Sequence, residues 1–428
     1  MRATPAPTLL IALLLVLGGA AADAAGERRF PLGLHGFLLG AVSGRTTGAQ
    51  PPQAAAGDLV LAEERLRLEL TGASAGGALV LARGDVFHDA VAGRAGGELR
   101  EAYAGVAAGP VDIRAGRQIV TWGVGDLLFI DDVFAKDWES FFSGRPMEYL
   151  KLGVDGLRLR WSPRAVSTEL LFLPFFTPDD LPTPERFVFF DPFSGTPARE
   201  EKPDLASPGS PELALRLHRP LGGFDLSFYA YRGFWRTPSL RVEAAETTAI
   251  KFYPRLGIYG ASAQRSTLGG VVSLEAGRYD SREDRAGSDP AIPNAEWRLL
   301  GGYQRQLGPD AVIGVQLYGE AMEDHGAYLN SLPPAMPVRD ELRGVASVRW
   351  TQFLDYQTWK LSLFAAWSPT DEDAFIQPEA TWKATDRLSL SLGANIFEGE
   401  SAATFFGQLE KSDNLFMRVR FDFSAFGS

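Results

Sequence analysis

The chain offers few side chains for catalysis or metal binding. It has no cysteine and four histidines, His35, His88, His218 and His325, none of which lies in a nucleophile motif. An enzymatic nucleophile needs a base held within hydrogen-bond reach, and no H-x-x-x-H or H-E-x-x-H spacing suggests a metal. The acidic stretch from Asp126 to Asp137 lacks the spacing of an EF-hand loop. We therefore expect no catalytic residue, no metal, no cofactor and no enzyme activity.

Arginines instead dominate the polar chemistry, because many of them alternate with apolar residues. In Leu157–Trp161, for example, Arg158 and Arg160 fall between Leu157, Leu159 and Trp161. The same pattern marks the candidate selectivity residues, which are Arg65, Arg67, Arg158, Arg160, Arg216, Arg298, Arg349, Arg418 and Arg420. Acidic residues expected on the same face are fewer, namely Glu69, Glu275, Glu320, Glu379 and Asp422. Two interpretations stay open: a basic wall that attracts anionic solutes, or arginines that pair with carboxylates and stiffen the wall.

One loop-like segment, residues 122–153, combines acidic and aromatic side chains. Its aromatic and apolar residues favour burial, whereas a solvated loop is usually polar. The segment can fold into a lumen and narrow it, or it can cap the structure from outside. An inward fold would place the candidate constriction residues in the channel, and these are Trp122, Asp126, Asp131, Asp132, Asp137 and Arg145.

The elements that position these residues are predicted to be strands of about ten residues with alternating polarity. In Leu388–Phe397, Leu388, Leu390 and Leu392 share one face, and Ser389 and Ser391 share the other. This period is expected where one face of a strand meets lipid and the other meets a wet lumen. A soluble β-sandwich also alternates, so alternation alone does not decide between the two folds.

The lengths of the breaks between strands favour a barrel, because long and short breaks take turns. Long breaks fall near 44–58, 87–97, 122–153, 174–210, 235–255, 279–295, 322–340 and 398–413, and a shorter one near 369–373 keeps the order. Outer-membrane barrels have long extracellular loops and short periplasmic turns. Nine loops and eight turns predict a single transmembrane, antiparallel, up-and-down β-barrel of about 18 strands (range 16–18).

Both ends of the chain carry export signals. A basic Arg2, the apolar run Leu9–Leu17 and small residues up to Ala25 predict a secretory signal peptide over 1–24. Residues 25–428 then form one barrel domain. The last strand places Leu415, Met417 and Val419 opposite Arg418 and Arg420, which is similar to the signal read by the barrel-assembly machinery. We expect that machinery and outer-membrane lipid as partners, in the outer membrane of a Gram-negative cell.

Composition excludes two further classes of protein. The net charge of −11 argues against a nucleic-acid partner. Beyond the N-terminus, the longest apolar runs, such as Leu361–Trp367, are far shorter than the 20 or so residues of a membrane-spanning helix. The sequence therefore does not fit a helical inner-membrane protein.

Several short motifs resemble a known group of proteins. Gly116–Gly123 (GRQIVTWG) opens into a loop with Asp131–Asp132, and the tail contains Gly393–Gly399 (GANIFEG) and Phe405–Gln408 (FFGQ) before a terminal R-x-R-F-x-F strand. These features resemble alginate-export-like outer-membrane porins of proteobacteria, and especially a related uncharacterised family often encoded beside efflux pumps for hydrophobic solutes. The resemblance implies an 18-stranded barrel and transport, without fixing a substrate.

We therefore expect an outer-membrane porin for small solutes that has residues 122–153 as its constriction, and that favours anions if the basic-wall interpretation holds. The solute itself is not predicted. An alternative is an outer-membrane component for export or uptake of a hydrophobic solute, linked to an efflux system, in which loop aromatics line the path. A third is a structural or adhesin-like barrel, whose loop aromatics would be exposed to partners.

Overall fold

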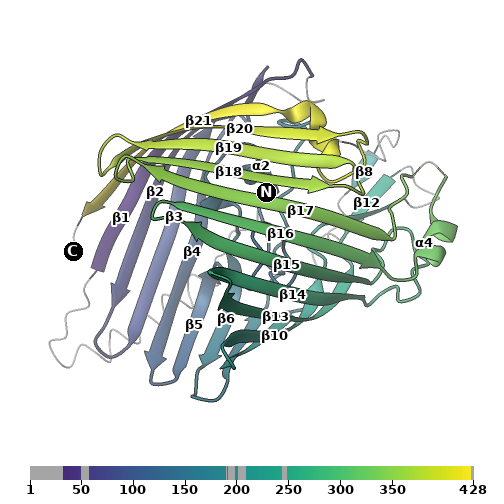
Figure 1. Cartoon of the computed structure of the whole chain (residues 1–428), viewed down its shortest axis with the longest axis horizontal. Coiled ribbons are helices and arrows are strands. Elements are labelled where there is room, and N and C mark those ends of the chain that lie inside the picture. Colours follow the sequence, from purple (N-terminus) through teal and green to yellow (C-terminus); the bar gives the residue numbers. More distant parts are fainter. Residues whose placement is uncertain are drawn as a thin grey trace.

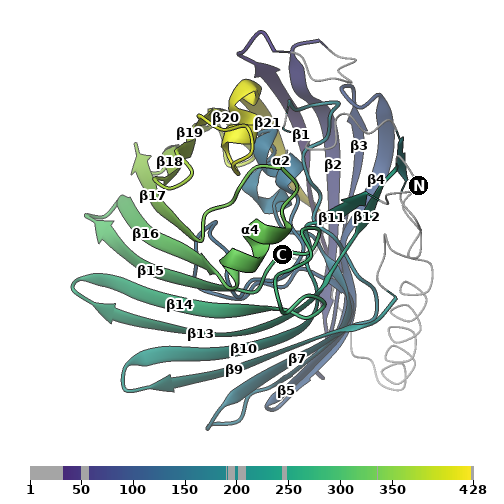
Figure 2. The same cartoon turned by 90° about the vertical axis from the view of Figure 1, so that its right-hand side faces the viewer.

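A computed structural model shows the chain as a closed antiparallel β-barrel of 18 strands with one small additional sheet (Figures 1 and 2). The structure describes residues 32–49, 57–188, 190, 198–200, 209–242, 248–334 and 336–425. The predicted signal peptide lies outside these residues. None of the described helices is long and apolar enough to cross a membrane.

Each barrel strand pairs with its neighbour in the chain, and the first strand pairs with the last. The first nine strands are β1 (Leu32–Arg45), β2 (Leu59–Ala73), β3 (Ala78–Asp89), β4 (Arg94–Ala108), β5 (Val111–Gln118), β6 (Val154–Trp161), β7 (Ser167–Leu173), β9 (Glu212–Leu221) and β10 (Phe224–Phe234). The other nine are β13 (Arg255–Thr267), β14 (Gly270–Ser281), β15 (Glu296–Leu307), β16 (Ala311–Met322), β17 (Leu342–Leu354), β18 (Trp359–Ser368), β19 (Asp373–Lys383), β20 (Leu388–Gly399) and β21 (Asn414–Ala425). The ladder from Leu34 opposite Ala425 to Arg45 opposite Asn414 closes the ring, so the sheet has no free edge.

The remaining elements lie in the connections at one end of the barrel. A small sheet contains β8 (Ala198–Glu200), β11 (Ser239–Val242) and β12 (Thr248–Phe252). The short helices are α2 (Trp138–Phe142), η1 (Met147–Tyr149), α4 (His325–Ser331) and η2 (Gly407–Ser412). In Figure 1, β8, β12 and α4 lie at the opposite end from the C-terminus. We call the end with these longer connections extracellular and the other end periplasmic.

The predicted order of nine loops and eight turns is confirmed, with local differences. The break expected near 87–97 is only four residues long, because β3 and β4 stay paired up to Asp89 opposite Arg94. The turn expected near 262–267 falls at Leu268 and Gly269, whose φ angles of 54° and 72° close a tight hairpin. The strands on either side of that turn are therefore longer than predicted.

The predicted division into an apolar and a polar face is also observed. Leu392 on β20 is 62% exposed on the outside of the barrel, whereas Asn395, three residues further along the strand, is buried and bonds inward to the loop after β5. On β2, Arg65 and Arg67 are each only 4% exposed, while Leu68 is 44% exposed. The exposed leucines form the surface that faces lipid, because a barrel in a membrane keeps its apolar band outside.

Candidate functional site: the lumen and its inward loop

The segment between β5 and β6, residues 119–153, folds into the barrel and is called the inward loop below. In Figure 2, its helix α2 lies within the ring of strands, near β21 and β1. On that side the carbonyl oxygen of Phe142 accepts hydrogen bonds from Asn395 Nδ2 (2.9 Å) and Asn414 Nδ2 (3.1 Å). On β14, the Glu275 carboxylate binds the other part of the loop. The loop therefore crosses the lumen from wall to wall and narrows it.

Aromatic side chains hold the inward loop against the wall. Phe142 packs on Phe375 of β19 and Phe397 of β20, with ring centroids 5.6 Å and 5.3 Å apart. Phe141 lies 5.4 Å from Phe375, and Trp122 packs on Phe134 at 5.1 Å. These rings are almost fully buried and form a hydrophobic core inside the barrel. The sequence predicted their burial, but not the inward-facing phenylalanines of β19 and β20 that accept them.

Glu275 fixes the start of the inward loop. Its carboxylate accepts hydrogen bonds from the backbone N–H groups of Val124 (2.7 Å), Gly125 (3.0 Å) and Asp131 (2.8 Å). The loop bends sharply around it, with φ of 75° at Gly123 and 61° at Leu127. A carboxylate that accepts several backbone N–H groups forms strong, charge-assisted bonds, so Glu275 is the main anchor for this stretch. Gln316 Oε1 also accepts from the Asp126 N–H (3.2 Å), and the Tyr279 hydroxyl donates to the Ile130 carbonyl (2.5 Å).

Asp131 places a second carboxyl group beside this anchor. Its side chain is 1% exposed, and neither of its oxygens has a hydrogen-bond partner within the described part of the chain. Burial, together with the negative charge of Glu275, raises the pKa of Asp131 to about 9. Asp131 is therefore neutral near pH 7, which lowers the cost of burying it next to Glu275.

The other candidate constriction residues mostly build the loop. Trp122 Nε1 donates to Glu169 of β7 (2.8 Å), Asp132 pairs with Lys151 Nζ (2.5 Å), and Asp137 caps helix α2 through the Ser140 N–H (2.7 Å). Arg145 is buried and pairs with Glu63. Asp126 differs, because its side chain remains 45% exposed while it pairs with Arg349 of β17. Among these six residues, Asp126 is the one with substantial access to solvent in the lumen.

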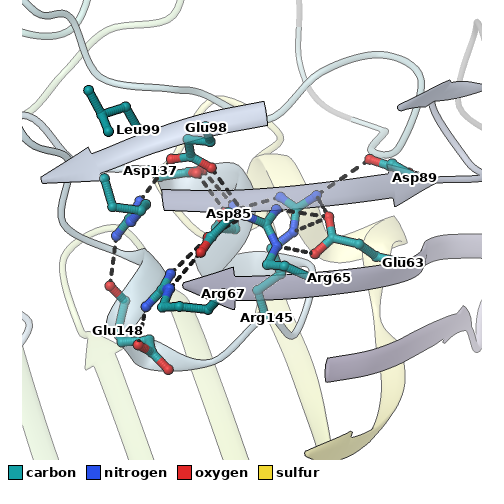
Figure 3. Close-up of polar contacts among 12 residues, drawn as sticks. Glu63, Arg65, Arg67, Asp85, Asp89, Glu98, Leu99, Asp137, Arg145 and Glu148 are labelled. Atoms are coloured by element: carbon teal, nitrogen blue, oxygen red, sulfur yellow. Dashed lines mark hydrogen bonds and ion pairs between the residues drawn. The ribbon is translucent and has the colours of Figure 1, made fainter. Parts of the chain in front are cut away.

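The arginines of β2 belong to a dense ionic network in the wall (Figure 3). Arg65 bonds Glu63 and Asp85, both at 2.7 Å, and the Arg67 guanidinium bonds Asp85 at 2.5 Å and Glu148 of the loop at 2.6 Å. In Figure 3, Arg145 reaches Glu63 from the inward loop. These charges are paired within the protein, so they join the loop to the wall and offer little free cationic charge to a solute.

Most of the remaining candidate arginines also have carboxylate partners. Arg298 pairs with Glu296 (2.5 Å), Arg418 with Glu379 (2.5 Å) and Arg420 with Glu148 (2.7 Å) and Asp422 (2.9 Å). The count of carboxylates from sequence was too low, since it missed the inward residues Glu63, Asp85, Glu98, Glu148, Glu169 and Glu296. The sequence spacing could have indicated these pairs. A spacing of two, as in Glu63-x-Arg65, places both residues on the same face of a strand, so an inward arginine implies that a carboxylate two positions away is inward as well.

One sector of the wall keeps an excess of arginine. Arg158 and Arg160 of β6 both bond the single carboxylate of Glu169 on β7 (2.9 Å and 3.0 Å). Arg216 of β9 lies opposite Glu169 in the sheet, and it bonds the hydroxyl of Ser227 (3.2 Å) rather than a carboxylate. We call these three arginines the basic sector. The side chain of Arg160 is 41% exposed, so this sector can contact solutes.

A cavity of about 400 Å³ opens on the periplasmic side of the loop. Its lining includes Arg67, Arg83, Glu148, Arg420 and Asp422. Charges of both signs face it, so it is a polar vestibule without a dominant sign. No group of three or more acidic or histidine side chains in the described ranges could hold a metal ion.

A serine in a nucleophile-like pattern has a structural role. Gly72–Gly76 reads G-x-S-x-G, but Ser74 lies in the turn between β2 and β3. Its Oγ accepts a hydrogen bond from the Ala78 N–H (3.1 Å). Ser74 thus stabilises a hairpin turn. The lumen itself is a passage lined by polar and charged side chains.

Comparisons with known proteins bear on the fold. No protein-family model matches the chain, and no curated protein matches it by sequence. Solved structures do match along nearly the whole chain. The fold is that of a porin-type barrel. Pseudomonas aeruginosa OccK2 (OpdF), in complex with glucuronate, matches with a TM-score of 0.57 and 10% identity over 92% of this chain and 99% of that one.

Two further structures agree. Acinetobacter baumannii OccAB3 matches with a TM-score of 0.56 and 8% identity, over 92% of this chain and 99% of its own. P. aeruginosa OprD matches with a TM-score of 0.51 and 10% identity, over 94% of this chain and 96% of its own. At such identities the likeness concerns the fold. It supports the broad resemblance to outer-membrane porins, and it gives no support to the narrower resemblance to alginate-export barrels.

Proposed function

We propose that this protein is an outer-membrane channel for small solutes. The observation that carries the proposal is the combination of an 18-stranded barrel with one loop folded across its lumen. Barrels of 16 to 18 strands leave an aqueous interior, and an inward loop sets the size of what passes. The signal peptide over 1–24, recognition of β21 by the barrel-assembly machinery and residence in the outer membrane belong to the same proposal.

Selectivity in this proposal depends on the basic sector more than on a continuous ladder of arginines. Elsewhere the candidate arginines are neutralised by carboxylates, whereas Arg158 and Arg160 share the carboxylate of Glu169 and Arg216 bonds the Ser227 hydroxyl instead. A local excess of positive charge against a low-dielectric wall concentrates anions. The glucuronate complex of OccK2 makes a carboxylated sugar a suitable first probe.

The alternative functions are less well supported by the loop aromatics. A path for a hydrophobic solute requires these rings to line open space, and an adhesin requires them on the outer surface. Phe134, Phe141 and Phe142 are instead 2–4% exposed in the core of the inward loop. They serve to hold the loop.

Planar-bilayer recording tests the proposal. We expect discrete conductance steps from the refolded barrel in potassium chloride, and glucuronate should lower the current by occupying the channel. Absence of conductance at every voltage would refute the channel. Liposome swelling separates the alternatives, because entry of apolar dyes without entry of sugars would favour the hydrophobic path.

A further inference from the structure

Arginines gather on the outer wall of the barrel at its extracellular end. They are Arg232 at the end of β10, Arg255 at the start of β13, Arg278 on β14, and Arg282 and Arg285 directly after β14. We call these five residues the outer arginine patch. The protein as a whole carries a net charge of −11, so a concentration of positive charge on this wall needs a separate explanation.

The sheet register places the patch on the outside. Tyr259 of β13, which is 62% exposed, lies opposite Arg278, and Arg278 lies opposite Trp297 of β15, which is 47% exposed. Arg255 lies an even number of residues from Tyr259 on β13, so both point to the same face. Arg282 likewise lies four residues after Arg278 and continues the same face. Arg232 lies beside Gly257 in the next row. Successive residues of a strand point to opposite faces, so these arginines do not face the lumen.

The carboxylates around the patch balance only part of its charge. Arg255 lies 3.5 Å from Glu283, Arg278 bonds Glu323 at 2.8 Å, and Arg285 lies 3.3 Å from Asp280. Arg278 also lies 3.6 Å from Asp280. Three carboxylates thus form ion pairs with three of the five guanidinium groups. Within the described ranges, neither Arg232 nor Arg282 forms an ion pair.

A small cavity lies within the patch. It measures about 250 Å³ and is lined by Arg278, Asp280, Arg285 and Ala295. The side chain of Arg285 is 72% exposed and that of Arg255 is 56% exposed. Several guanidinium groups can therefore approach one ligand from the surface.

An apolar belt begins directly below the patch. Phe228 of β10, Leu274 of β14, Leu299 of β15 and Leu317 of β16 are between 56% and 71% exposed, closer to the periplasmic end. Exposed apolar residues at this level face acyl chains, so the patch lies at the level of the outer-leaflet headgroups. At the same end of β2 and β3, the outward residues are instead Glu64 and His88. The rim at β2 and β3 therefore lacks the positive charge of the patch.

We propose that the outer arginine patch binds the phosphorylated sugar headgroup of an outer-leaflet glycolipid of the lipid A type. Guanidinium groups bind phosphate oxygens in a bidentate manner, and clusters of basic residues at a membrane surface recognise anionic lipids. The acyl chains would lie along the apolar belt beside Trp297 and Phe228. This inference rests on the outer-membrane location in the proposed function, but it does not depend on conduction.

Native mass spectrometry of the full barrel in detergent tests this site. The probes are bisphosphorylated lipid A, dephosphorylated lipid A, phosphatidylglycerol and inorganic phosphate. We expect the triple variant R232Q/R255Q/R282Q to bind bisphosphorylated lipid A at least about tenfold more weakly than the unmodified protein. The matched control is R265Q/R305Q, which removes two exposed outward arginines from the periplasmic ends of β13 and β15, and it should bind normally.

Each other outcome overturns the site. Equal weakening in both variants would mean that any arginine on the wall attracts lipid. Unchanged binding in the triple variant, or equal binding of dephosphorylated lipid A, would remove the role of phosphate contacts. Tight binding of inorganic phosphate or phosphatidylglycerol would assign the patch to free phosphate or to a general anionic lipid.

Folding and conduction are monitored separately. Heat-modifiable migration in electrophoresis reports the folded barrel, and if the triple variant fails this check, R232Q alone should still weaken binding two- to threefold. Bilayer conductance of the same samples distinguishes the two proposals. A barrel that binds lipid A but never conducts would refute the proposed channel and support the lipid site. A barrel that conducts but does not bind lipid A would refute the lipid site and support the channel.

Discussion

The Glu275 carboxylate of β14 accepts a 2.8 Å hydrogen bond from the backbone N–H of Asp131, whose own carboxyl group is buried beside it. The wall thus anchors the inward loop with one acidic group while the loop brings a second into the same space. Only one of the two can carry its negative charge at low cost, so the position of the loop is coupled to the proton on Asp131.

The inward loop should loosen in alkaline solution. Its anchoring raises the pKa of Asp131 from 3.8 to about 9, so the buried state binds this proton more tightly than a released, hydrated loop does. Anchoring is therefore strongest below about pH 4 and weakens by up to about 1.4 kcal/mol per pH unit as pH rises toward 9. Single-channel conductance measured from pH 5 to 10 should rise and become noisier toward pH 9. Asp131→Asn should remove this dependence, and an identical profile in that variant would contradict the mechanism.

Removal of the anchor itself should release the start of the loop at neutral pH. Glu275→Ala leaves the N–H groups of Val124, Gly125 and Asp131 without their acceptor, and each buried, unsatisfied group costs about 1–3 kcal/mol. We expect larger conductance and faster hydrogen exchange over residues 123–131. Glu69→Gln is the matched control, since Glu69 pairs with Arg83 away from these N–H groups. Equal exchange in the two variants would show that Glu275 is not the anchor.

Glu63 should be essential for the contact between α2 and the wall. Its buried carboxylate pairs with both Arg65 and Arg145, and Glu63→Gln would leave those buried guanidinium groups poorly compensated, at a cost of about 3–5 kcal/mol. The adjacent Glu64→Gln is a close control, because Glu64 is 78% exposed and faces outward. Its effect on stability should stay within about 0.5 kcal/mol. Urea unfolding in lipid vesicles would measure both, and similar midpoints would count against the network.

The basic sector should control ion selectivity. Arg158→Glu with Arg160→Glu changes the local charge by four units around Glu169, so the reversal potential in a salt gradient should move toward cation preference. Arg65→Gln is a useful comparison, since Arg65 is already neutralised by Glu63 and Asp85. A reversal potential that stays constant in the double variant would mean that these arginines serve the wall alone.

The two faces of β20 should respond differently to charge. Leu392 is 62% exposed on the outside, and an arginine near the bilayer midplane costs about 2–4 kcal/mol. Leu392→Arg should therefore lower the yield of folded barrel in vesicles. Ser391→Arg places the same charge in the wet lumen and should be tolerated, so equal yields would contradict the assignment of faces.

The sequence alone determined the barrel, because a strand between lipid and water must alternate and its connections must differ in length on the two sides of the membrane. The alternation in segments such as Leu388–Phe397 identified the strands. The order of long and short breaks was then sufficient to predict their number. The apolar character of Phe141 and Phe142 was also sufficient to predict that they are buried, since the transfer of apolar rings from water to an apolar surface is favourable.

Only the tertiary structure decided where those rings are buried and which charges remain free. The wall residues that hydrogen-bond the inward loop, Glu275, Asn395 and Asn414, lie 144, 253 and 272 positions along the chain from their partners in the loop, and sequence periodicity carries no information about such pairings. The same holds for the arginines. Alternation predicted the face of Arg65 and Arg67, but their ion pairs with Asp85 depend on the register of β2 against β3. Whether an arginine attracts a solute or stiffens a wall is therefore a property of the closed barrel.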